Sequence, residues 1–178
     1  REVTTFTIDP NDAKDFDDAI YAEPKDGGGH ICWVAIADVS AFVTPGSKLD
    51  KSAYKKGNST YLPDRVEPML PEELSADLCS LRPHEDRACM AVRMEFDKDG
   101  NKTGHKFVRG IMRSHARLTY AQAQEAFEGK PGEVAQTVYP VLKNIHTAYK
   151  SMEKARIARG PLAINVPERK VKVNDKGE

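Results

Sequence analysis

Five aspartates lie within ten residues near the start of the chain, between two segments that have the composition of β-strands. They are Asp9, Asp12, Asp15, Asp17 and Asp18. Apolar, β-prone residues precede this stretch in 3–8 and follow it in 19–22. Like charges that are held together cost free energy unless a positive group lies among them. Any fold that places this stretch between two core-seeking segments therefore has to compensate for its charge.

The composition indicates one soluble domain, because 178 residues with 39% hydrophobic and 30% charged side chains can bury a core of their own. The formal net charge is zero, so any nucleic-acid site has to be a local feature. Three cysteines without metal-ligand spacing are interpreted as buried apolar residues in a reducing compartment. No signal peptide or membrane-spanning run is recognised, so we expect a cytoplasmic protein without a membrane partner. Because the chain begins at Arg1, we interpret it as a piece of a longer protein.

The hydrophobic pattern predicts a mixture of strands and helices. Strands are predicted over residues 2–8, 18–22, 31–39, 87–96, 106–114 and 169–173, and helices over 47–56, 119–128 and 133–159. A short helix is expected after Pro71, and 60–71 is expected to be extended. The continuous apolar run of 31–39 predicts a central strand that is buried on both faces. The fold class is α+β, with a mixed, mostly antiparallel sheet covered by helices.

Four of the aspartates are candidate metal ligands and catalytic residues, namely Asp9, Asp15, Asp17 and Asp18. Asp9 ends the first strand, and we expect the other three at the start of the next. In extended chain Asp15 and Asp17 project to one side and Asp18 to the other, so a bend at Phe16 or a bulge has to bring them together. Carboxylate clusters suit hard cations such as Mg²⁺ or Mn²⁺. Two such ions can activate a water and stabilise the leaving oxygen in phosphodiester hydrolysis.

Two simpler interpretations of the acidic stretch are weaker. A calcium loop of the EF-hand type needs a glycine at its sixth position, where counting from Asp9 gives Lys14. A solvated acidic loop is the common fate of an aspartate-rich stretch. The interleaved Pro10, Ala13 and Phe16 count against that alternative without removing it.

The stretch from Thr7 to Ala19 resembles the active-site signature of the ribonuclease II/ribonuclease R (RNB) family, which hydrolyses RNA from the 3′ end. Further blocks resemble the same family in the same order, at residues 34–40, 45–47, 61–66, 68–75, 78–81 and 113–120. The resemblance is strongest to the bacterial ribonuclease R branch. It covers the N-terminal part of the catalytic domain, so 1–178 is expected to be a portion of that domain truncated at both ends.

The resemblance implies a metal-dependent 3′→5′ exoribonuclease that converts single-stranded RNA to nucleoside 5′-monophosphates, with DNA not a preferred substrate. The implied cofactor is Mg²⁺, with Mn²⁺ as an alternative. Carried over by motif, Asp9, Asp15 and Asp18 hold metal, and Asp17 is the carboxylate most critical for the chemical step. The sequence itself indicates no oligomeric state.

Two tyrosines match RNA-binding positions of the family. Tyr61 matches the aromatic residue that stacks on the 3′-terminal base, a sequence-independent mode of binding. Tyr120 matches a residue near the sugars that helps to distinguish RNA from DNA, a distinction that depends on the 2′-hydroxyl group. For both tyrosines the alternative is ordinary packing in the core.

The chain departs from the family pattern at three positions. Many relatives carry an acid where Ala163 stands, and a phenylalanine that closes the stack of bases where Ile164 stands. Ala41 stands where many carry a histidine. The family's essential arginine and much of its RNA channel belong to the part downstream of the match. We therefore expect this chain alone to be weakly active or inactive. The alternatives are a non-catalytic RNA-binding or regulatory fragment and a metal-dependent phosphohydrolase of small substrates.

Overall fold

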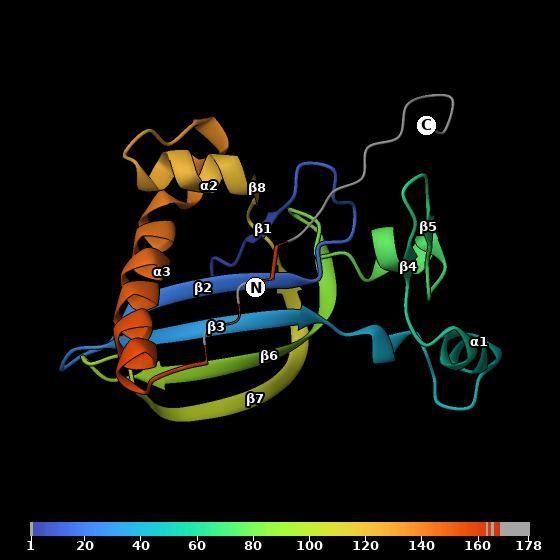
Figure 1. Cartoon of the computed structure of the whole chain (residues 1–178), viewed down its shortest axis with the longest axis horizontal. Coiled ribbons are helices and arrows are strands. Elements are labelled where there is room, and N and C mark those ends of the chain that lie inside the picture. The colour runs from blue at the N-terminus through green and yellow to red at the C-terminus, as the bar shows by residue number, and fades with distance from the viewer. Residues whose placement is uncertain (1, 163, 165, 168–178) are drawn as a thin grey trace.

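A four-stranded antiparallel sheet in the order β2-β3-β6-β7 forms the centre of the molecule (Figure 1). The computed structural model describes residues 2–162, 164, 166 and 167. The strands of this sheet are β2 (Asp18–Pro24), β3 (His30–Ala37), β6 (Asp86–Phe96) and β7 (Lys102–Arg113). Two small units add a parallel pair, β1 (Thr7–Asp9) with β8 (Arg117–Thr119), and a hairpin, β4 (Thr60–Tyr61) with β5 (Val66–Glu67). The predicted α+β class with a mostly antiparallel sheet is confirmed.

The helices lie at two ends of this sheet. They are α1 (Lys48–Lys56), α2 (Tyr120–Phe127) and α3 (Glu133–Ala158), together with the 3₁₀ turn η1 (Val39–Ala41) and the π-helical turn η2 (Leu74–Leu78). In Figure 1, α3 crosses one end of the sheet, whereas α1 and the β4–β5 hairpin lie beyond the other end. In the same view, the loop between β1 and β2 lies at the end of the sheet that is nearer the hairpin (Figure 1).

Two hydrophobic clusters attach α2 and α3 to the strands. Phe6 and Leu118, next to and within the β1–β8 pair, pack with Val138 and Leu142 of α3. Farther along, Ala148 and its neighbours on α3 cover one end of β2 and β3. These contacts fix β1, and with it the first aspartate of the acidic stretch, against a rigid helix.

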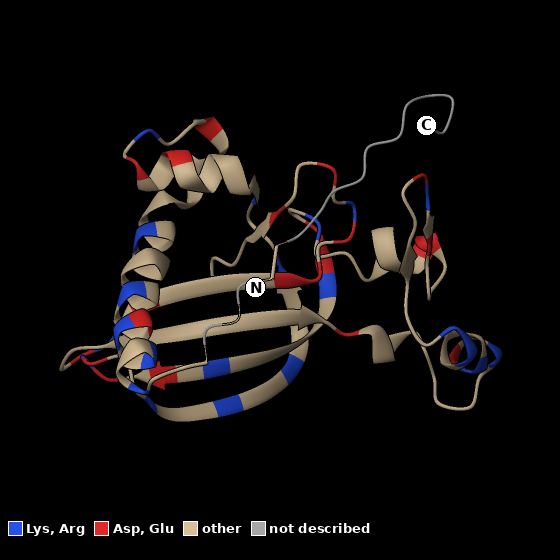
Figure 2. Cartoon of the chain, in the orientation of Figure 1, with Lys and Arg blue, Asp and Glu red and all other residues tan. Residues whose placement is uncertain are grey.

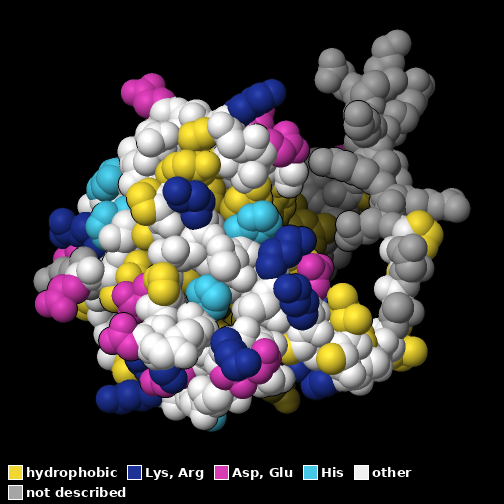
Figure 3. All heavy atoms as spheres, turned by 90° about the vertical axis from the view of Figure 1, so that its left-hand side faces the viewer, with side chains coloured by type: hydrophobic (Ala, Val, Ile, Leu, Met, Phe, Trp, Pro, Cys, Tyr) yellow, Lys and Arg dark blue, Asp and Glu magenta, His cyan; other side chains and the backbone are white. Residues whose placement is uncertain are grey.

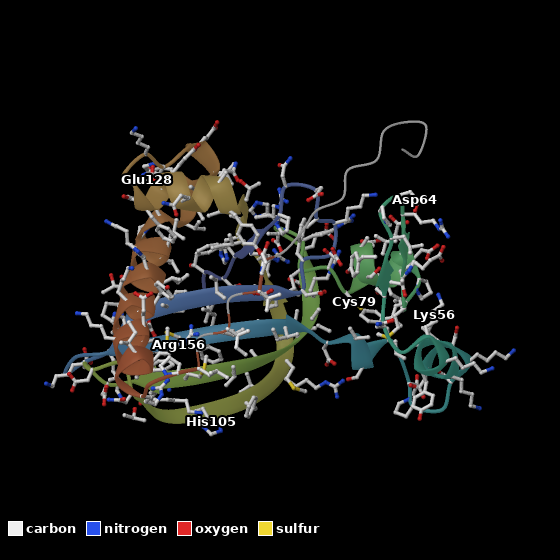
Figure 4. All side chains as sticks on the ribbon, viewed as in Figure 1. Lys56, Asp64, Cys79, His105, Glu128 and Arg156 are labelled. Carbon is white, nitrogen blue, oxygen red and sulfur yellow. The ribbon has the colours of Figure 1, made fainter. Side chains whose placement is uncertain are left out.

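A third cluster attaches the segment after η2 to the opposite face of the sheet. Leu74, Cys79 and Leu81 pack on Ala19 and on neighbouring small residues of β3 and β6. In Figure 4, Cys79 lies between the central sheet and the β4–β5 hairpin. The three cysteines are buried, as predicted, and burial raises the pKa of the Cys32 thiol to about 11.

The first residues of two predicted helices, Ser47 and Thr119, cap α1 and α2 in the structure. Ser47 accepts a hydrogen bond from the amide of Asp50 at the start of α1. Thr119 and Gln122 form the reciprocal pair of hydrogen bonds of a capping box at the start of α2. Both helix starts predicted from side-chain spacing are confirmed within one residue.

Several predicted details are wrong. The first strand is restricted to Thr7–Asp9, and the first part of 60–71, residues 60–67, folds into a hairpin. Although β3 is central, Ile36 is 46% exposed, because α3 covers only the other end of that face. In the first turn of α3, Ala135 is buried and Val134, which was predicted to lie on the buried face, is exposed. The predicted strand 169–173 lies outside the described residues.

The surface carries both charge signs without a large field of either. Figure 3 shows the side on which α3 lies, where basic and acidic side chains are interspersed. This arrangement agrees with the formal net charge of zero. Within the described part of the chain, no helix is long and apolar enough to cross a membrane.

Candidate metal centre and substrate cavity

The acidic stretch forms the connection between β1 and β2, and pairing of the strands fixes both of its ends. Asp9 ends β1 and is paired in register with Thr119 of β8. Asp18 begins β2 and is paired with Ile36 of β3. A two-way backbone bridge between Phe6 and Ile20 closes the base of the connection. Residues 10–17 are thus held as a loop, which we call the carboxylate loop.

Asp15 and Asp17 do not belong to the second strand, which corrects the prediction. They lie in the carboxylate loop, before β2 begins at Asp18. Residues 13–17 belong to no helix or strand, so these aspartates are not held in a regular extended strand. Alternation along a strand therefore does not separate these side chains onto two faces.

Asp9 is the buried member of the group. The residue is 7% exposed, and its Oδ2 accepts a hydrogen bond of 2.6 Å from the hydroxyl of Thr7. Burial raises the pKa of Asp9, and repulsion from Asp18 and Asp15 adds to this rise. The hydrogen bond from Thr7 and the charge of Arg117 act in the opposite direction. The fold thus holds the Asp9 carboxylate in place, and burial and neighbouring negative charges make its ionised form unfavourable.

The pKa of Asp17 is affected by all three other candidate aspartates. Desolvation by the surrounding protein raises its pKa, and repulsion from Asp15, Asp18 and Asp9 raises it further. Figure 2 shows the acidic residues gathered at the start of β2 and in the adjoining loop. The four aspartates predicted to act together therefore form one electrostatic cluster. A bound cation would relieve their repulsion.

The donor chemistry fits a hard divalent cation, because the cluster offers only carboxylate oxygens. Among the described residues, however, no three His, Cys, Asp or Glu side chains are close enough together to hold a metal ion. Asp15, Asp17 and Asp18 are exposed, and aspartate carboxylates turn about two side-chain torsions. Metal binding therefore requires these three side chains to converge on Asp9, on a backbone that already holds them within electrostatic reach.

A cavity of about 630 Å³ opens between the carboxylate loop and the β4–β5 hairpin. Its lining includes Asp9, Asp15 and Tyr61, whereas Asp17 and Asp18 are not among its lining residues. Tyr61 is 74% exposed, which excludes the alternative that it packs in the core. The structure thus brings two predicted metal ligands and one predicted RNA-binding residue to the same cavity.

Tyr120 lies near the acidic group but outside this cavity. It is the first residue of α2 and directly follows Thr119, the register partner of Asp9. It is 62% exposed, so core packing is excluded here as well. Its position places an exposed phenol next to the end of β1.

Sequence reasoning missed three charged residues of the cavity. Asp12, which had no proposed role, lines it together with Lys14 and Glu72. Lys14 and Glu72 form an ion pair of 3.5 Å between exposed side chains, so the pair contributes little to stability. The sequence did place Asp12 close to a predicted ligand, because it lies three residues before Asp15. It did not indicate that residues 60–67 fold into a hairpin that lines the other side of the cavity.

Two of the three departures from the family pattern are on the surface, and the third, at position 163, lies outside the described residues. Ile164 is described and is exposed, and no contact of its side chain with the cavity is seen. Ala41 ends η1 and is exposed. Neither residue contributes to the lining of the cavity.

Comparison with known sequences relates the whole chain to one family. The model of the RNB domain matches residues 1–178. Ribonuclease R of Vibrio cholerae is 46% identical over 172 residues, which is 96% of this chain and 21% of that protein. Ribonuclease R of Escherichia coli is 45% identical over 173 residues, with the same two shares. The chain therefore spans about a fifth of the length of these curated relatives.

Comparison with solved structures relates the chain to the same family. The structure of Mycoplasma genitalium RNase R in complex with double-stranded RNA matches with a TM-score of 0.92 at 32% identity. The match covers 99% of this chain and 31% of that one. The same enzyme in complex with ribose methylated single-stranded RNA matches equally well, over 99% of this chain and 28% of that one.

Proposed function

The chain belongs to the RNB family, and on that basis we propose that it supplies the metal-binding carboxylates and part of the RNA-binding surface of a 3′→5′ exoribonuclease of the ribonuclease R type. The observation that carries the proposal is the shared cavity of Asp9, Asp15 and Tyr61. A carboxylate pair facing an exposed aromatic residue suits a substrate that combines a phosphodiester with a stacking base.

In this proposal Asp9, Asp15, Asp17 and Asp18 would hold Mg²⁺ or Mn²⁺. Bound there, the metal would supply an activated water and stabilise the leaving oxygen of the phosphodiester. The buried Asp9 gives the site a fixed edge, because Thr7 and the β1–β8 pairing hold its carboxylate. The three exposed aspartates can adjust to the substrate phosphate. Asp17, whose pKa is raised by all three others, is the proposed centre of the chemical step.

The tyrosines would bind the RNA. Tyr61 offers an exposed ring on which any base can stack, which suits degradation irrespective of sequence. Tyr120, next to the end of β1, is proposed to contact the ribose and to favour RNA over DNA through the 2′-hydroxyl. Single-stranded RNA is the proposed substrate, and nucleoside 5′-monophosphates are the proposed products.

The test is a chimera in which residues 1–178 replace the matching segment of E. coli ribonuclease R. With 5′-labelled single-stranded RNA and Mg²⁺, we expect progressive shortening from the 3′ end and release of 5′-monophosphates. Addition of EDTA should stop the reaction, and DNA of the same sequence should remain intact. Internal cleavage products, or hydrolysis that continues in EDTA, would overturn the proposal. RNA binding that is independent of Mg²⁺, in a chimera that never cleaves, would favour the non-catalytic alternative.

A further inference from the structure

A buried serine contacts the carboxylate loop from the side of the sheet. The Ser80 hydroxyl donates a hydrogen bond of 3.0 Å to the carbonyl oxygen of Lys14 and accepts one of 3.0 Å from the amide of Phe16. These two peptide groups flank Asp15. One side chain thus fixes the backbone on both sides of a proposed metal ligand.

The neighbours of Ser80 extend this contact along the loop. The amide of Leu81 donates to the carbonyl oxygen of Phe16 at 2.8 Å, and the amide of Ala37 donates to that of Asp17 at 2.9 Å. Four hydrogen bonds therefore attach the backbone of Lys14, Phe16 and Asp17 to the sheet or to the segment packed on it.

Ser80 is itself rigidly held. The residue is fully buried, at 0% exposure, between Cys79 and Leu81, which belong to the core. Its carbonyl oxygen accepts a hydrogen bond of 2.9 Å from Nε of Arg87 on β6. A buried hydroxyl with both of its bonds made to one loop has little freedom to turn elsewhere.

The other end of the carboxylate loop is held from β8. The Arg117 guanidinium donates to the carbonyl oxygens of Pro10 and Asn11, and it lies over the ring of Phe16, 5.3 Å from the ring centre. Ser80 and Arg117 therefore contact the loop from two different elements. Asp12 lies between the two sets of backbone contacts, and Asp15 lies between the two contacts of Ser80.

We propose that Ser80 is a positioning residue for the carboxylate cluster, a role that rests on the metal function proposed above. Four aspartates repel one another and drive the loop toward conformations in which they are farther apart. The two hydrogen bonds of Ser80 oppose that movement of the backbone at Asp15, so that only side-chain rotation is needed to bring Asp15 to the metal. Groups that orient metal ligands typically affect metal affinity about 10- to 100-fold.

The test uses Mn²⁺ binding to the 178-residue chain, measured by calorimetry and by electron paramagnetic resonance. Ser80→Ala should weaken Mn²⁺ binding about 10-fold or more. Ser80→Cys keeps the volume but replaces the hydroxyl by a weak hydrogen-bonding thiol, and it should also weaken binding. Ser114→Ala is the matched control, because Ser114 is equally buried but donates to Ala116, away from the loop. It should leave Mn²⁺ affinity unchanged.

Thermal unfolding of each variant gives its folded fraction, and the Mn²⁺ affinity is calculated for the folded protein only. Unchanged affinity in both Ser80 variants would overturn the positioning role and leave the metal site standing. An equal loss in Ser114→Ala, or a loss that vanishes when only folded protein is counted, would also overturn it. If the unsubstituted chain binds no Mn²⁺, the proposed metal function itself fails and the role of Ser80 fails with it.

Discussion

The Thr7 hydroxyl donates a hydrogen bond of 2.6 Å to the Asp9 carboxylate, and both residues are buried in β1. Their side chains share one face of the strand because they are two residues apart. This bond opposes the rise in pKa that burial imposes on Asp9. A buried carboxylate at the edge of an acidic cluster thus owes its position to a neighbour within the same short strand.

Replacing Thr7 by valine should destabilise the protein. The shape is preserved, but the Asp9 carboxylate loses its donor, and a buried acceptor without a partner costs about 1–3 kcal/mol in the free energy of unfolding. Urea denaturation at neutral pH measures this difference. Thr5→Val is the control, because the Thr5 hydroxyl is buried without a partner among the described residues. It should be neutral or stabilising, and an equal loss in both variants would contradict the argument.

Replacing Tyr61 by alanine should weaken RNA binding. Loss of one stacked base costs about 1–3 kcal/mol in binding free energy, largely independent of sequence. Fluorescence anisotropy with labelled single-stranded RNA, in a chimera also carrying Asp17→Asn to prevent cleavage, measures the affinity. Tyr54→Ala is the matched control, because Tyr54 is 87% exposed on α1 and does not line the cavity. Equal effects of the two substitutions would show that Tyr61 has no specific role.

Stability should fall in acid partly through Glu95. Hydrogen bonds from Lys25 and Arg93 lower the pKa of Glu95 to about 2, from its ordinary value of 4.5. A carboxylate whose pKa is lowered by folding contributes stability above its ordinary pKa, and this contribution is lost as the pH falls from about 5 to about 2. Glu95→Gln should therefore have a smaller loss of urea midpoint over that window than the unsubstituted chain. Parallel pH profiles of the two proteins would contradict this assignment.

Local chemistry made much of the fold predictable. Ser47 and Thr119 cap helices wherever their tertiary neighbours lie, so their roles could be inferred from spacing alone. The four strands of the central sheet were predicted from apolar runs separated by turn residues. The acidic stretch was recognised as one cluster because its members lie within ten residues of one another, which limits how far apart their side chains can be.

Long-range partners were not predictable in the same way. The parallel pairing of Thr7 with Arg117 joins segments that are far apart in the chain, and three-residue strands carry no periodic signal. The hydrogen bonds of Ser80 to the carboxylate loop depend on the packing of Leu81 in the core. A serine in an otherwise apolar segment gives no indication of which backbone groups it will contact. The cavity could not be predicted either, because the carboxylate loop and the β4–β5 hairpin that line it are far apart in the sequence.

Asp17→Asn should abolish hydrolysis in the chimera while RNA binding largely persists. The substitution removes a charge from the proposed centre of the chemical step but leaves Tyr61 and the cavity lining in place. Gel-based cleavage and anisotropy, performed on the same preparation, separate the two effects. A parallel loss of RNA binding would assign Asp17 a structural role instead.

The 178-residue chain alone should cleave RNA far more slowly than the chimera. It spans about a fifth of the length of its curated relatives, and its surface has no net positive charge to attract a polyanion. Its Mn²⁺ binding should nevertheless resemble that of the chimera, because all four aspartates and their contacts with Thr7 and Ser80 lie within it. Comparing cleavage rate and Mn²⁺ affinity in the two proteins separates metal binding from RNA engagement. Processive degradation by the chain alone would show that these residues suffice for both.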